Sequence, residues 1–590
     1  MLDALPYLID YPYGCTEQTM SRFLPAAITA KTLRDLRLDP ETAMNRVFGG
    51  IEQSTASATH PKGKHGLNEL DTITRHSLER LYNFQHADGG WGWWKDGESD
   101  HFMTAYVLWG MALARQAGIE VKLDVAERAA SYLDKELVEE EVNYDQQAWM
   151  LHALAVYQGK SNVQRPTSNV KSDGARAGSA GILPAASSAI TQFQSKAFNN
   201  LYTNRDKLNA YTRALLALSA HSFGYTDKAK TLIENLENGV KIDSQPDSSI
   251  VQQGVRSSDA SVMATAHWGE DGIYWRWSEG GVEATSFALR ALLAVDPDNK
   301  LIEPVTNWLV KNRRGAQWSN TRDTAIVVLT LNDYLRQSGE LQPQIGYELV
   351  VNGKSIATKQ IAAADALGAP SRFDIPPEVI RDGANDVTIR RTSGAGPLYF
   401  SAEAKFFSLE EPLTPAGNEI FVRRQYFKLV NHPTLLKGFV AERVPLNDGD
   451  TVKSGERVET VITVEAKNNY EYLIFEDLKP AGLEAVEIRS GESLFVKELK
   501  SGALTEKKST LMNYTYASDF TGRTRWVYQE LRDRKVALFI DHLPQGVWQL
   551  RYEMRAESPG AFHALSVLGH AMYVPEIRTN GAEARIKVVD

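Results

Sequence analysis

A turn rich in glycine and tryptophan, followed by an apolar helix that begins near a threonine, recurs in the first part of this 590-residue chain. The three clearest copies are Trp91 with Thr104, Trp275 and Trp277 with Thr285, and Trp318 with Thr324. The segments after these turns are apolar on nearly every face, which is typical of buried helices. Helix pairs that cannot bury such faces alone must stack on one another. The repeat therefore predicts a closed α/α-toroid over residues 1–338, with the tryptophan turns as packing corners.

The hydrophobic pattern changes after about residue 344, where the period becomes two. Asn352-Gly353 follows an apolar run and is a strong hairpin signal. A half-buried strand is indicated near the end of the chain by alternating Trp548, Leu550, Tyr552 and Met554. These patterns predict a small β-domain over residues 344–408 and a β-sandwich over 418–590. The predicted fold class is therefore multidomain, first α and then β.

Residues 161–190, inside the helical part, are rich in serine, alanine and glycine and lack helical periodicity. Segments of this composition bury too little apolar surface to offset the entropy of ordering. We expect a disordered insertion in a loop of the toroid.

The composition argues against several classes of function. A net charge of −9 and a pI near 5.8 argue against nucleic acid as a main partner. No apolar run of about 18 residues is present, so no membrane span is expected. The N-terminus has neither the basic nor the apolar region of a signal peptide. One cysteine allows no intramolecular disulfide, and no cofactor or metal site is predicted.

That single cysteine, Cys15, stands three residues before Gln18. A lone cysteine is most often a small buried hydrophobe with no chemistry. At this spacing, however, a Cys15 thiolate could attack the Gln18 side-chain amide, expel ammonia and close a ring that holds a reactive acyl group. Gly14 would allow the tight, left-handed backbone that such a ring needs. A helix is expected after Gln18, and its N-terminal dipole would favour the thiolate of Cys15.

The segment YPYGCTEQTMSRFLPA, residues 11–26, resembles the thioester segment of the α2-macroglobulin and complement family. Its Tyr-Pro-Tyr before Gly-Cys resembles the bacterial members. The resemblance implies an internal thioester between Cys15 and Gln18, with Gly14 and Glu17 in its turn. It also implies the C-terminal portion of such a protein: a toroidal thioester domain, a CUB-like β-domain and a macroglobulin-type β-sandwich.

The same resemblance implies a shield over the thioester. In bacterial members a Met-Tyr pair on the terminal domain lies against the bond, and the matching positions are Met572 and Tyr573, with Tyr11 and Tyr13 beside the motif. A thioester persists only where water is excluded, so large side chains on a movable domain would form a removable cover. The alternative is that Met572 and Tyr573 are ordinary core residues of a strand.

The implied activity is broad-spectrum inhibition of endopeptidases by single-use covalent trapping, and not turnover catalysis. Some complement relatives carry a histidine that redirects the acyl group to hydroxyls, but the matching stretch here, residues 138–149, has none. We therefore expect direct attack by amines such as a protease lysine. Further implied partners are the N-terminal macroglobulin domains and bait region, absent from this chain. The implied location is extracytoplasmic: the periplasm, the cell surface or the medium.

Two other functions stay open on the sequence. Phe84-Gln85 followed by Asp88-Gly89-Gly90-Trp91 resembles the QW repeat of triterpene cyclases, which are also α/α-toroids. Those enzymes need an acidic Asp-x-Asp-Asp cluster, which is missing, and lack the β-rich second half. The remaining possibility is a degenerate fragment with a binding or structural role only.

Overall fold

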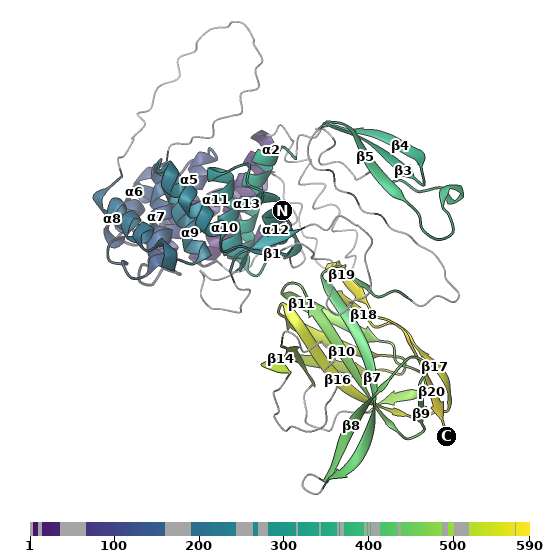
Figure 1. The fold of residues 1–590 in the computed structure, drawn as a ribbon. Helices are drawn as coiled ribbons and strands as arrows, with labels where there is room; N and C mark the ends of the chain where they lie inside the picture. The colour runs from purple at the N-terminus through teal and green to yellow at the C-terminus, as the bar shows by residue number, and fades with distance from the viewer. Residues whose placement is uncertain are drawn as a thin grey trace.

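In a computed structural model of the chain, helices fill the first part and β-strands fill the second (Figure 1). The structure describes residues 4–9, 14–35, 67–159, 190–243, 264–269, 281–313, 317–340, 344–362, 365, 371–394, 398, 400, 402, 413–434, 438–486, 494–500, 519–572 and 574–590. This order confirms the predicted fold class. The predicted insertion over 161–190 lies outside the described residues, apart from its last residue.

The helical part is a double-layered ring. Its inner helices are α2 (Thr16–Asp35), α5 (His101–Gln116), α7 (Tyr144–Gln158), α9 (Ala210–Ser222), α11 (Gly281–Val295) and α13 (Thr321–Ser338). Each inner helix contacts the next, and α13 contacts α2, so the ring is closed as predicted. Outside it pack α4 (Leu67–Phe84), α6 (Leu123–Glu136), α8 (Gln192–Thr203), α10 (Thr226–Glu237) and α12 (Ile302–Lys311), while the short α1 (Leu5–Ile9) contacts α2.

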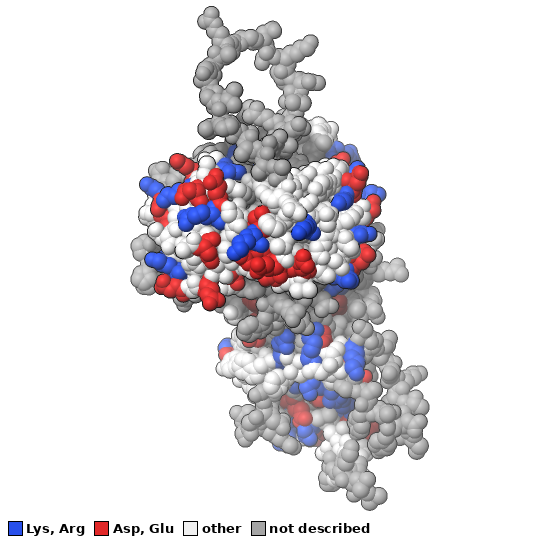
Figure 2. Space-filling model, turned by 90° about the vertical axis from the view of Figure 1, so that its left-hand side faces the viewer, with Lys and Arg blue, Asp and Glu red and all other residues white. Residues whose placement is uncertain are grey.

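The two layers differ in burial, as their sequences require. Inner helix α11 is buried along almost all of its length, whereas outer helix α6 buries only Val125, Ala126, Ala129 and Leu133. A helix that is apolar on all faces is stable only when it is buried, and here amphipathic outer helices cover the inner ones. Over the face of the ring shown in Figure 2, acidic and basic side chains are interspersed.

Three tryptophan turns each join an outer helix to the following inner helix by the same two hydrogen bonds. The Trp91 indole N–H donates to the carbonyl of Leu81 in α4 (2.7 Å), and its backbone N–H donates to Thr104 Oγ1 in α5 (2.9 Å). Trp318 repeats the pattern with Leu309 and Thr324 (2.8 and 3.0 Å). The turns are therefore packing corners, as expected.

The middle copy uses a different tryptophan from the one predicted. Trp268 donates its indole N–H to Leu236 O (2.8 Å) and its backbone N–H to Thr285 Oγ1 (3.0 Å). It follows β2 (Thr265–His267), which pairs with β1 (Lys241–Asp243). Trp275 and Trp277, the predicted pair, lie outside the described residues. Trp275 and Trp277 follow a glycine, as in the other turns, while Trp268 precedes one.

A three-stranded antiparallel sheet follows the ring, with the order β4-β3-β5. Its strands are β3 (Ile345–Val351), β4 (Lys354–Ile361) and β5 (Val387–Ser393). Asn352 and Gly353 join β3 to β4 with φ angles of 51° and 81°. Positive φ at both positions is the signature of a type I′ hairpin turn, so the predicted hairpin is confirmed. The CUB-like assignment of this sheet stays a prediction.

The terminal part is built from β-strands. They are β6 (Ala416–Gly417), β7 (Ile420–Thr434), β8 (Gly438–Leu446), β9 (Thr451–Lys453), β10 (Arg457–Ala466), β11 (Tyr470–Asp477), β12 (Leu483–Ala485), β13 (Leu494–Leu499), β14 (Phe520–Leu531), β15 (Val536–Leu543), β16 (Gly546–Ala556), β17 (Gly560–Ala564), β18 (Leu568–Ala571), β19 (Val574–Asn580) and β20 (Ala584–Val589). We call residues 413–590 the terminal β-domain.

One sheet of this domain runs in the order β6-β19-β18-β11-β15-β14-β13-β16-β10-β7-β8, and β17-β20-β9 form a second. The first sheet folds back on itself, because β7 contacts both β18 and β19. Between its halves lies a core that includes Ile462, Phe475, Leu538 and Trp548. The alternation predicted around Trp548 is confirmed in β16, where every second residue is buried.

Candidate functional site

Cys15 and Gln18 lie together at the start of α2. The backbone N–H of Gln18 donates to Cys15 Sγ (3.5 Å), and the backbone N–H of Cys15 donates to Gln18 Oε1 (3.3 Å). This is the reciprocal pattern of a capping box, with a thiol where Ser or Thr usually stands and Gln at the third helical position. The otherwise unpaired N–H groups of a helix start thus hold the two side chains that a thioester would join.

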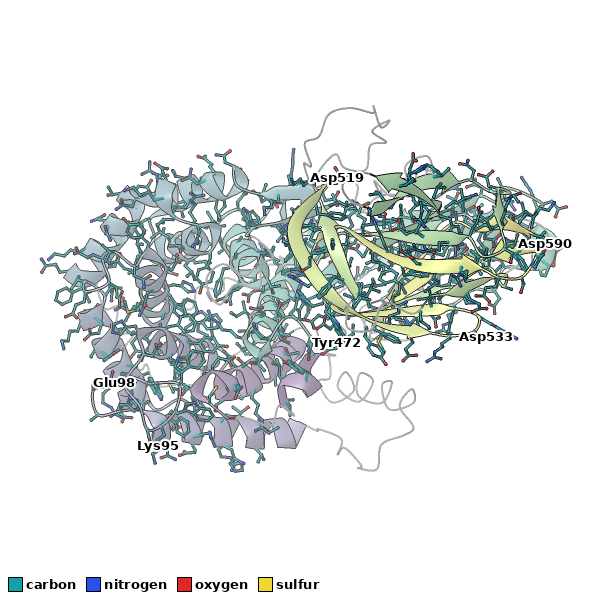
Figure 3. The ribbon with its side chains drawn as sticks, turned by 90° about the horizontal axis from the view of Figure 1, so that it is seen from below. Lys95, Glu98, Tyr472, Asp519, Asp533 and Asp590 are labelled. Atoms are coloured by element: carbon teal, nitrogen blue, oxygen red, sulfur yellow. The ribbon has the colours of Figure 1, made fainter. Side chains whose placement is uncertain are left out.

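The loop of residues 85–99 fixes this helix start from outside. Thr16 donates its backbone N–H to Trp93 O (3.0 Å) and its hydroxyl to Gly92 O (2.6 Å). The loop is in turn anchored by the Trp91 corner. Figure 3 shows Lys95 and Glu98, from the same loop, at the margin of the ring. Because Thr16 follows Cys15 directly, the position of Cys15 is set by this loop as well as by α2.

Glu17 points from the helix start into the ring. Its buried carboxylate accepts hydrogen bonds from Ser21 Oγ (2.6 Å) and from Thr321 Oγ1 (3.1 and 3.2 Å), the first residue of α13. Burial raises the pKa of Glu17, and these hydroxyls and the charge of Arg322 oppose the rise. Glu17 therefore closes the ring beside Cys15, joining its first inner helix to its last.

The first turns of other inner helices meet at the same end of the ring. Arg322, at the start of α13, is paired with Glu283 of α11 and donates to the Tyr211 hydroxyl of α9 (3.3 Å). Its guanidinium lies 4.0 Å from the ring centroid of Phe102 in α5. We call this end of the ring the Cys15 face.

Gly14 makes a contact with the outer layer that the sequence did not predict. Its role in the turn of the thioester stays a prediction. Its carbonyl accepts two hydrogen bonds from Arg80 of α4, from Nη2 (2.7 Å) and Nε (3.2 Å). A Cβ atom at this position would lie 2.9 Å from Arg80 Nη2, so a larger residue here would displace the Arg80 guanidinium.

The thiol is covered. Cys15 is 6% exposed, and burial raises its pKa, although hydrogen bonds from backbone N–H groups oppose the rise. The N–H groups at the start of α2 thus favour the thiolate of Cys15, as expected, but the loss of water outweighs them. Its burial screens Cys15 from solvent reagents.

Comparison with known proteins identifies the family. The family model described as the A-macroglobulin TED domain matches residues 2–334, and that described as the bacterial α2-macroglobulin MG10 domain matches residues 420–576. The chain belongs to the α2-macroglobulin family. The resemblance drawn from the Cys15 segment is confirmed, including its bacterial branch and its C-terminal domains. The limits of the three predicted domains stay predictions.

Relatives within the family are distant. The α2-macroglobulin of Thermotoga maritima is 24% identical over 65% of this chain and 18% of its own length. That of Escherichia coli is 21% identical over 98% of this chain and 28% of its own. The chain thus spans less than a third of the length of these curated relatives.

Two solved structures of Escherichia coli α2-macroglobulin are similar to this chain. The native protein from domain MG7 to the C-terminus is 16% identical, with a TM-score of 0.36 over 100% of this chain and 75% of that one. The trypsin-activated protein is 16% identical, with a TM-score of 0.43 over 98% and 32%.

Of the shielding residues implied by the family, only Met572 lies within the described residues; Tyr11, Tyr13 and Tyr573 do not. Met572 directly follows β18 and is 46% exposed, so it is not an ordinary core residue of a strand. Its backbone N–H donates to Tyr472 O in β11 (2.9 Å). Figure 3 shows Tyr472 at the edge of the terminal β-domain that lies beside the helical ring.

The stretch that matches the histidine-bearing loop of complement relatives follows α6. His101, which contacts Glu140 in this stretch, is the first residue of α5. Its Nδ1 lies 3.0 Å from Glu140 Oε1 and its Nε2 lies 3.7 Å from Glu136 Oε2. These two carboxylates hold the imidazole of His101 against the end of outer helix α6.

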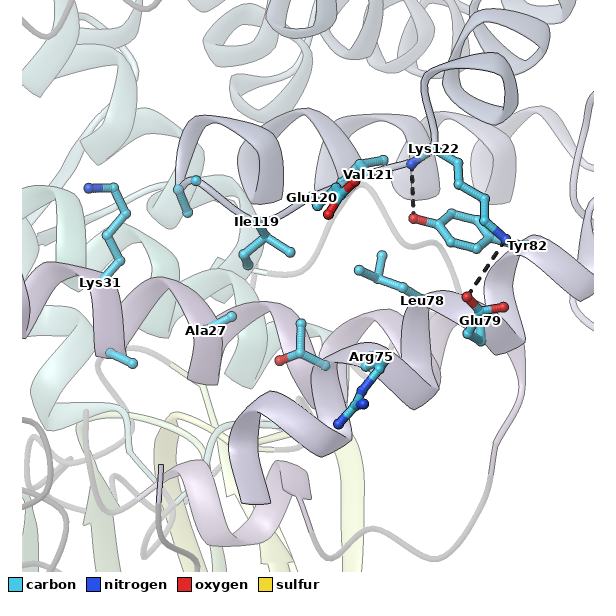
Figure 4. A pocket seen from close by; sticks show the side chains of 14 residues that line it. Ala27, Lys31, Arg75, Leu78, Glu79, Tyr82, Ile119, Glu120, Val121 and Lys122 are labelled. Carbon is cyan, nitrogen blue, oxygen red and sulfur yellow. Dashed lines mark hydrogen bonds and ion pairs between the residues drawn. The ribbon is translucent and has the colours of Figure 1, made fainter. Parts of the chain in front are cut away.

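A pocket of about 600 Å³ lies elsewhere on the ring (Figure 4). Ala27 and Lys31 of α2, Leu78 and Tyr82 of α4 and the loop of residues 117–122 line it. Ala27 is twelve residues after Cys15, or about 18 Å along the helix axis, so the pocket is separate from the candidate thioester. Within the described ranges, no helix is long and apolar enough to cross a membrane, and no cluster of metal-binding side chains is found.

Proposed function

We propose that this chain is the reactive component of a broad-spectrum endopeptidase inhibitor, which captures proteases through an internal thioester between Cys15 and Gln18. The observation that carries the proposal is the reciprocal hydrogen bonding of these two residues at the start of α2. Membership of the α2-macroglobulin family supports the same reading and sets the triterpene-cyclase alternative aside.

Formation of the bond needs no cofactor. Cys15 Sγ attacks Gln18 Cδ, the S–C bond forms and the C–N bond breaks. The leaving nitrogen takes up the thiol proton and departs as ammonia. A buried site suits this product, since water would hydrolyse the acyl group. Glu17 and Gly14 support the geometry, Glu17 by holding α2 on α13 and Gly14 by admitting Arg80.

In capture, the acyl group of Gln18 is transferred from the Cys15 sulfur to an amine of the protease. A lysine Nζ of the protease attacks Gln18 Cδ, an amide bond forms and the C–S bond breaks. The sulfur takes up the proton lost by the amine, so each event yields one amide and one free thiol. The bond is used once, which makes the chain an inhibitor and not a catalyst.

The cover over the bond is proposed to be Met572 and Tyr573 from the terminal β-domain, with Tyr11 and Tyr13 beside the motif. The half-exposed Met572 at the end of β18 is suited to a removable contact. N-terminal macroglobulin domains and a bait region are the proposed partners that release it, and the proposed location is extracytoplasmic.

Protease capture is tested directly with trypsin, which activated one of the solved Escherichia coli relatives. Because release of the cover is proposed to need the bait region, the test uses Met572→Gly, which removes a half-exposed side chain of the proposed cover. This variant is incubated with trypsin, denatured and digested, and the peptides are analysed by mass spectrometry. We expect Gln18 joined to a trypsin lysine, and no such product after pretreatment with methylamine or when Cys15→Ser is added. A Met572→Gly chain that reacts with methylamine but never with trypsin would contradict capture and would favour a binding or structural role.

The preference for amines is a separate claim. Equal concentrations of methylamine and glycerol are offered to the chain, and covalent addition at Gln18 is measured. We expect the amine to add and glycerol to add little, since residues 138–149 contain no histidine to activate a hydroxyl. Equal esterification of glycerol would contradict direct attack by amines.

A further inference from the structure

We propose that the ion pair between Lys311 and Glu419 is a positioning contact that holds the terminal β-domain on the Cys15 face of the ring. Lys311 Nζ lies 3.2 Å from Glu419 Oε1, and the two side chains are only 20% and 8% exposed. The inference rests on the proposed function in one respect: the contact would keep the cover of the thioester in place.

Lys311 lies at the same end of the ring as Cys15. It is the last residue of α12, and the Trp318 corner ties the last turn of α12 to the first turn of α13 through Leu309 and Thr324. Thr321, which begins α13, donates to Glu17 in the first turn of α2. A continuous set of hydrogen-bonded contacts thus leads from Lys311 to the helix start that Cys15 caps.

Glu419 is a fixed part of the terminal β-domain. Its Oε2 accepts hydrogen bonds from the Tyr470 hydroxyl (2.9 Å) and from Asn468 Nδ2 (3.2 Å). Its backbone carbonyl accepts from the N–H of Lys467 (3.0 Å). Because both its carboxylate and its backbone are hydrogen-bonded within the domain, Glu419 cannot move independently of the terminal β-domain.

Strand β11 connects the ion pair to Met572. Tyr470, which binds Glu419, begins β11, and Tyr472 in that strand accepts the backbone N–H of Met572. Figure 1 shows β11 and β19 at the end of the terminal β-domain nearest the helices. The ion pair therefore secures the edge of the domain that carries Met572.

The contact is sensitive to charge. The loss of a cationic partner from a largely buried carboxylate costs far more than the loss of an exposed pair. Lys311 also lies at the C-terminus of α12, where a positive charge is favoured by the helix dipole. Reversing either charge should push the domain away from the ring, and exchanging both charges should restore the attraction.

The test compares Lys311→Glu, Glu419→Lys and the exchanged double variant. The readout is the rate at which methylamine releases the Cys15 thiol from the native chain. We expect each single variant to react at least about tenfold faster than the parent chain, and the double variant to return to within about threefold. Single variants that react at the parental rate, or a double variant as fast as the singles, would overturn the proposal.

The matched control is Lys135→Glu. Lys135 lies in the last turn of outer helix α6, so its reversal places the same charge change at an equivalent helix end. It is 77% exposed and paired only weakly, with Glu136 at 3.6 Å. The rate of thiol release should be unchanged in this variant, and a general effect of charge at helix ends would be revealed by a change.

A second measurement works without the thioester. In Cys15→Ser, cysteines at exposed Val310 of α12 and Leu568 of β18 accept spin labels, and the distance distribution between them is measured. It should be narrow in the parent background, broad with Lys311→Glu and narrow again with the exchanged charges. A broad distribution in all backgrounds would overturn the positioning contact, while a narrow one with no thiol chemistry in the native chain would overturn only the proposed function.

Discussion

At the start of α2, a thiol occupies the place that a serine or threonine hydroxyl usually takes in a capping box. The same geometry that satisfies the helix N–H groups brings Sγ and the Gln18 amide together. The pairing was predictable from the sequence, because three-residue spacing at a helix start is local. The partners of Glu17 and Gly14 were not, because Thr321 and Arg80 are far away in the chain.

Substitutions at Cys15 can separate its role as the cap of α2 from its role in the thioester. Cys15→Ser keeps a good capping residue, whereas Cys15→Ala removes it, so the serine variant should be more stable by about 0.5–1 kcal/mol. Both variants should fail to release a thiol with methylamine. The free energy of unfolding from urea denaturation checks the first point. Equal stability of the two variants would show that this position does not cap α2.

Glu17 makes a prediction about pH. Its pKa is raised above the ordinary value of 4.5, so the folded chain holds this proton more tightly than the unfolded chain does. The contribution of Glu17 to the free energy of unfolding therefore falls as the pH rises from about 4.5 through the folded pKa. Glu17→Gln removes this cost.

The check is a series of urea denaturations of both proteins across that range. The difference in stability, variant minus parent, should increase with pH until Glu17 is ionised in the folded chain. A constant difference, or one that decreases with pH, would contradict the raised pKa.

At the scale of elements, the corner between an outer and an inner helix is the repeating unit of the ring. Three tryptophans make the same pair of hydrogen bonds, one to a carbonyl that ends an outer helix and one to a threonine that opens an inner helix. The threonines were all identified from the sequence, but one tryptophan was misassigned. Three tryptophans precede Thr285, and only the packing decides which of them reaches Leu236.

The corner can be tested at Thr324. Thr324→Val has nearly the same shape but leaves the backbone N–H of Trp318 buried without an acceptor, which should cost about 1–3 kcal/mol. Thr324→Ser keeps the hydroxyl and should cost clearly less. Thermal unfolding followed by circular dichroism gives both values. If valine and serine were equally tolerated, the hydroxyl would not be what holds the corner.

At the scale of the whole molecule, one end of the closed ring faces the terminal β-domain. Cys15 and Gln18, the candidate thioester residues, lie at the helix start on that same end. The order of helical and β parts, the hairpin at Asn352 and the strand around Trp548 follow from local periodicity, so they were predictable. The docking through Lys311 and Glu419 was not, because neither residue carries a local signal and the two are brought together only by the packing of separate domains.

If Cys15 and Gln18 are joined in the native chain, the mass of the intact protein will show the loss of ammonia. The chain is denatured without reducing agent or nucleophile and weighed, with Cys15→Ala as the reference. We expect a mass one ammonia below that calculated from the sequence, no titratable thiol, and one released thiol per chain after methylamine. A full mass with Cys15 titratable at once on unfolding would contradict the thioester.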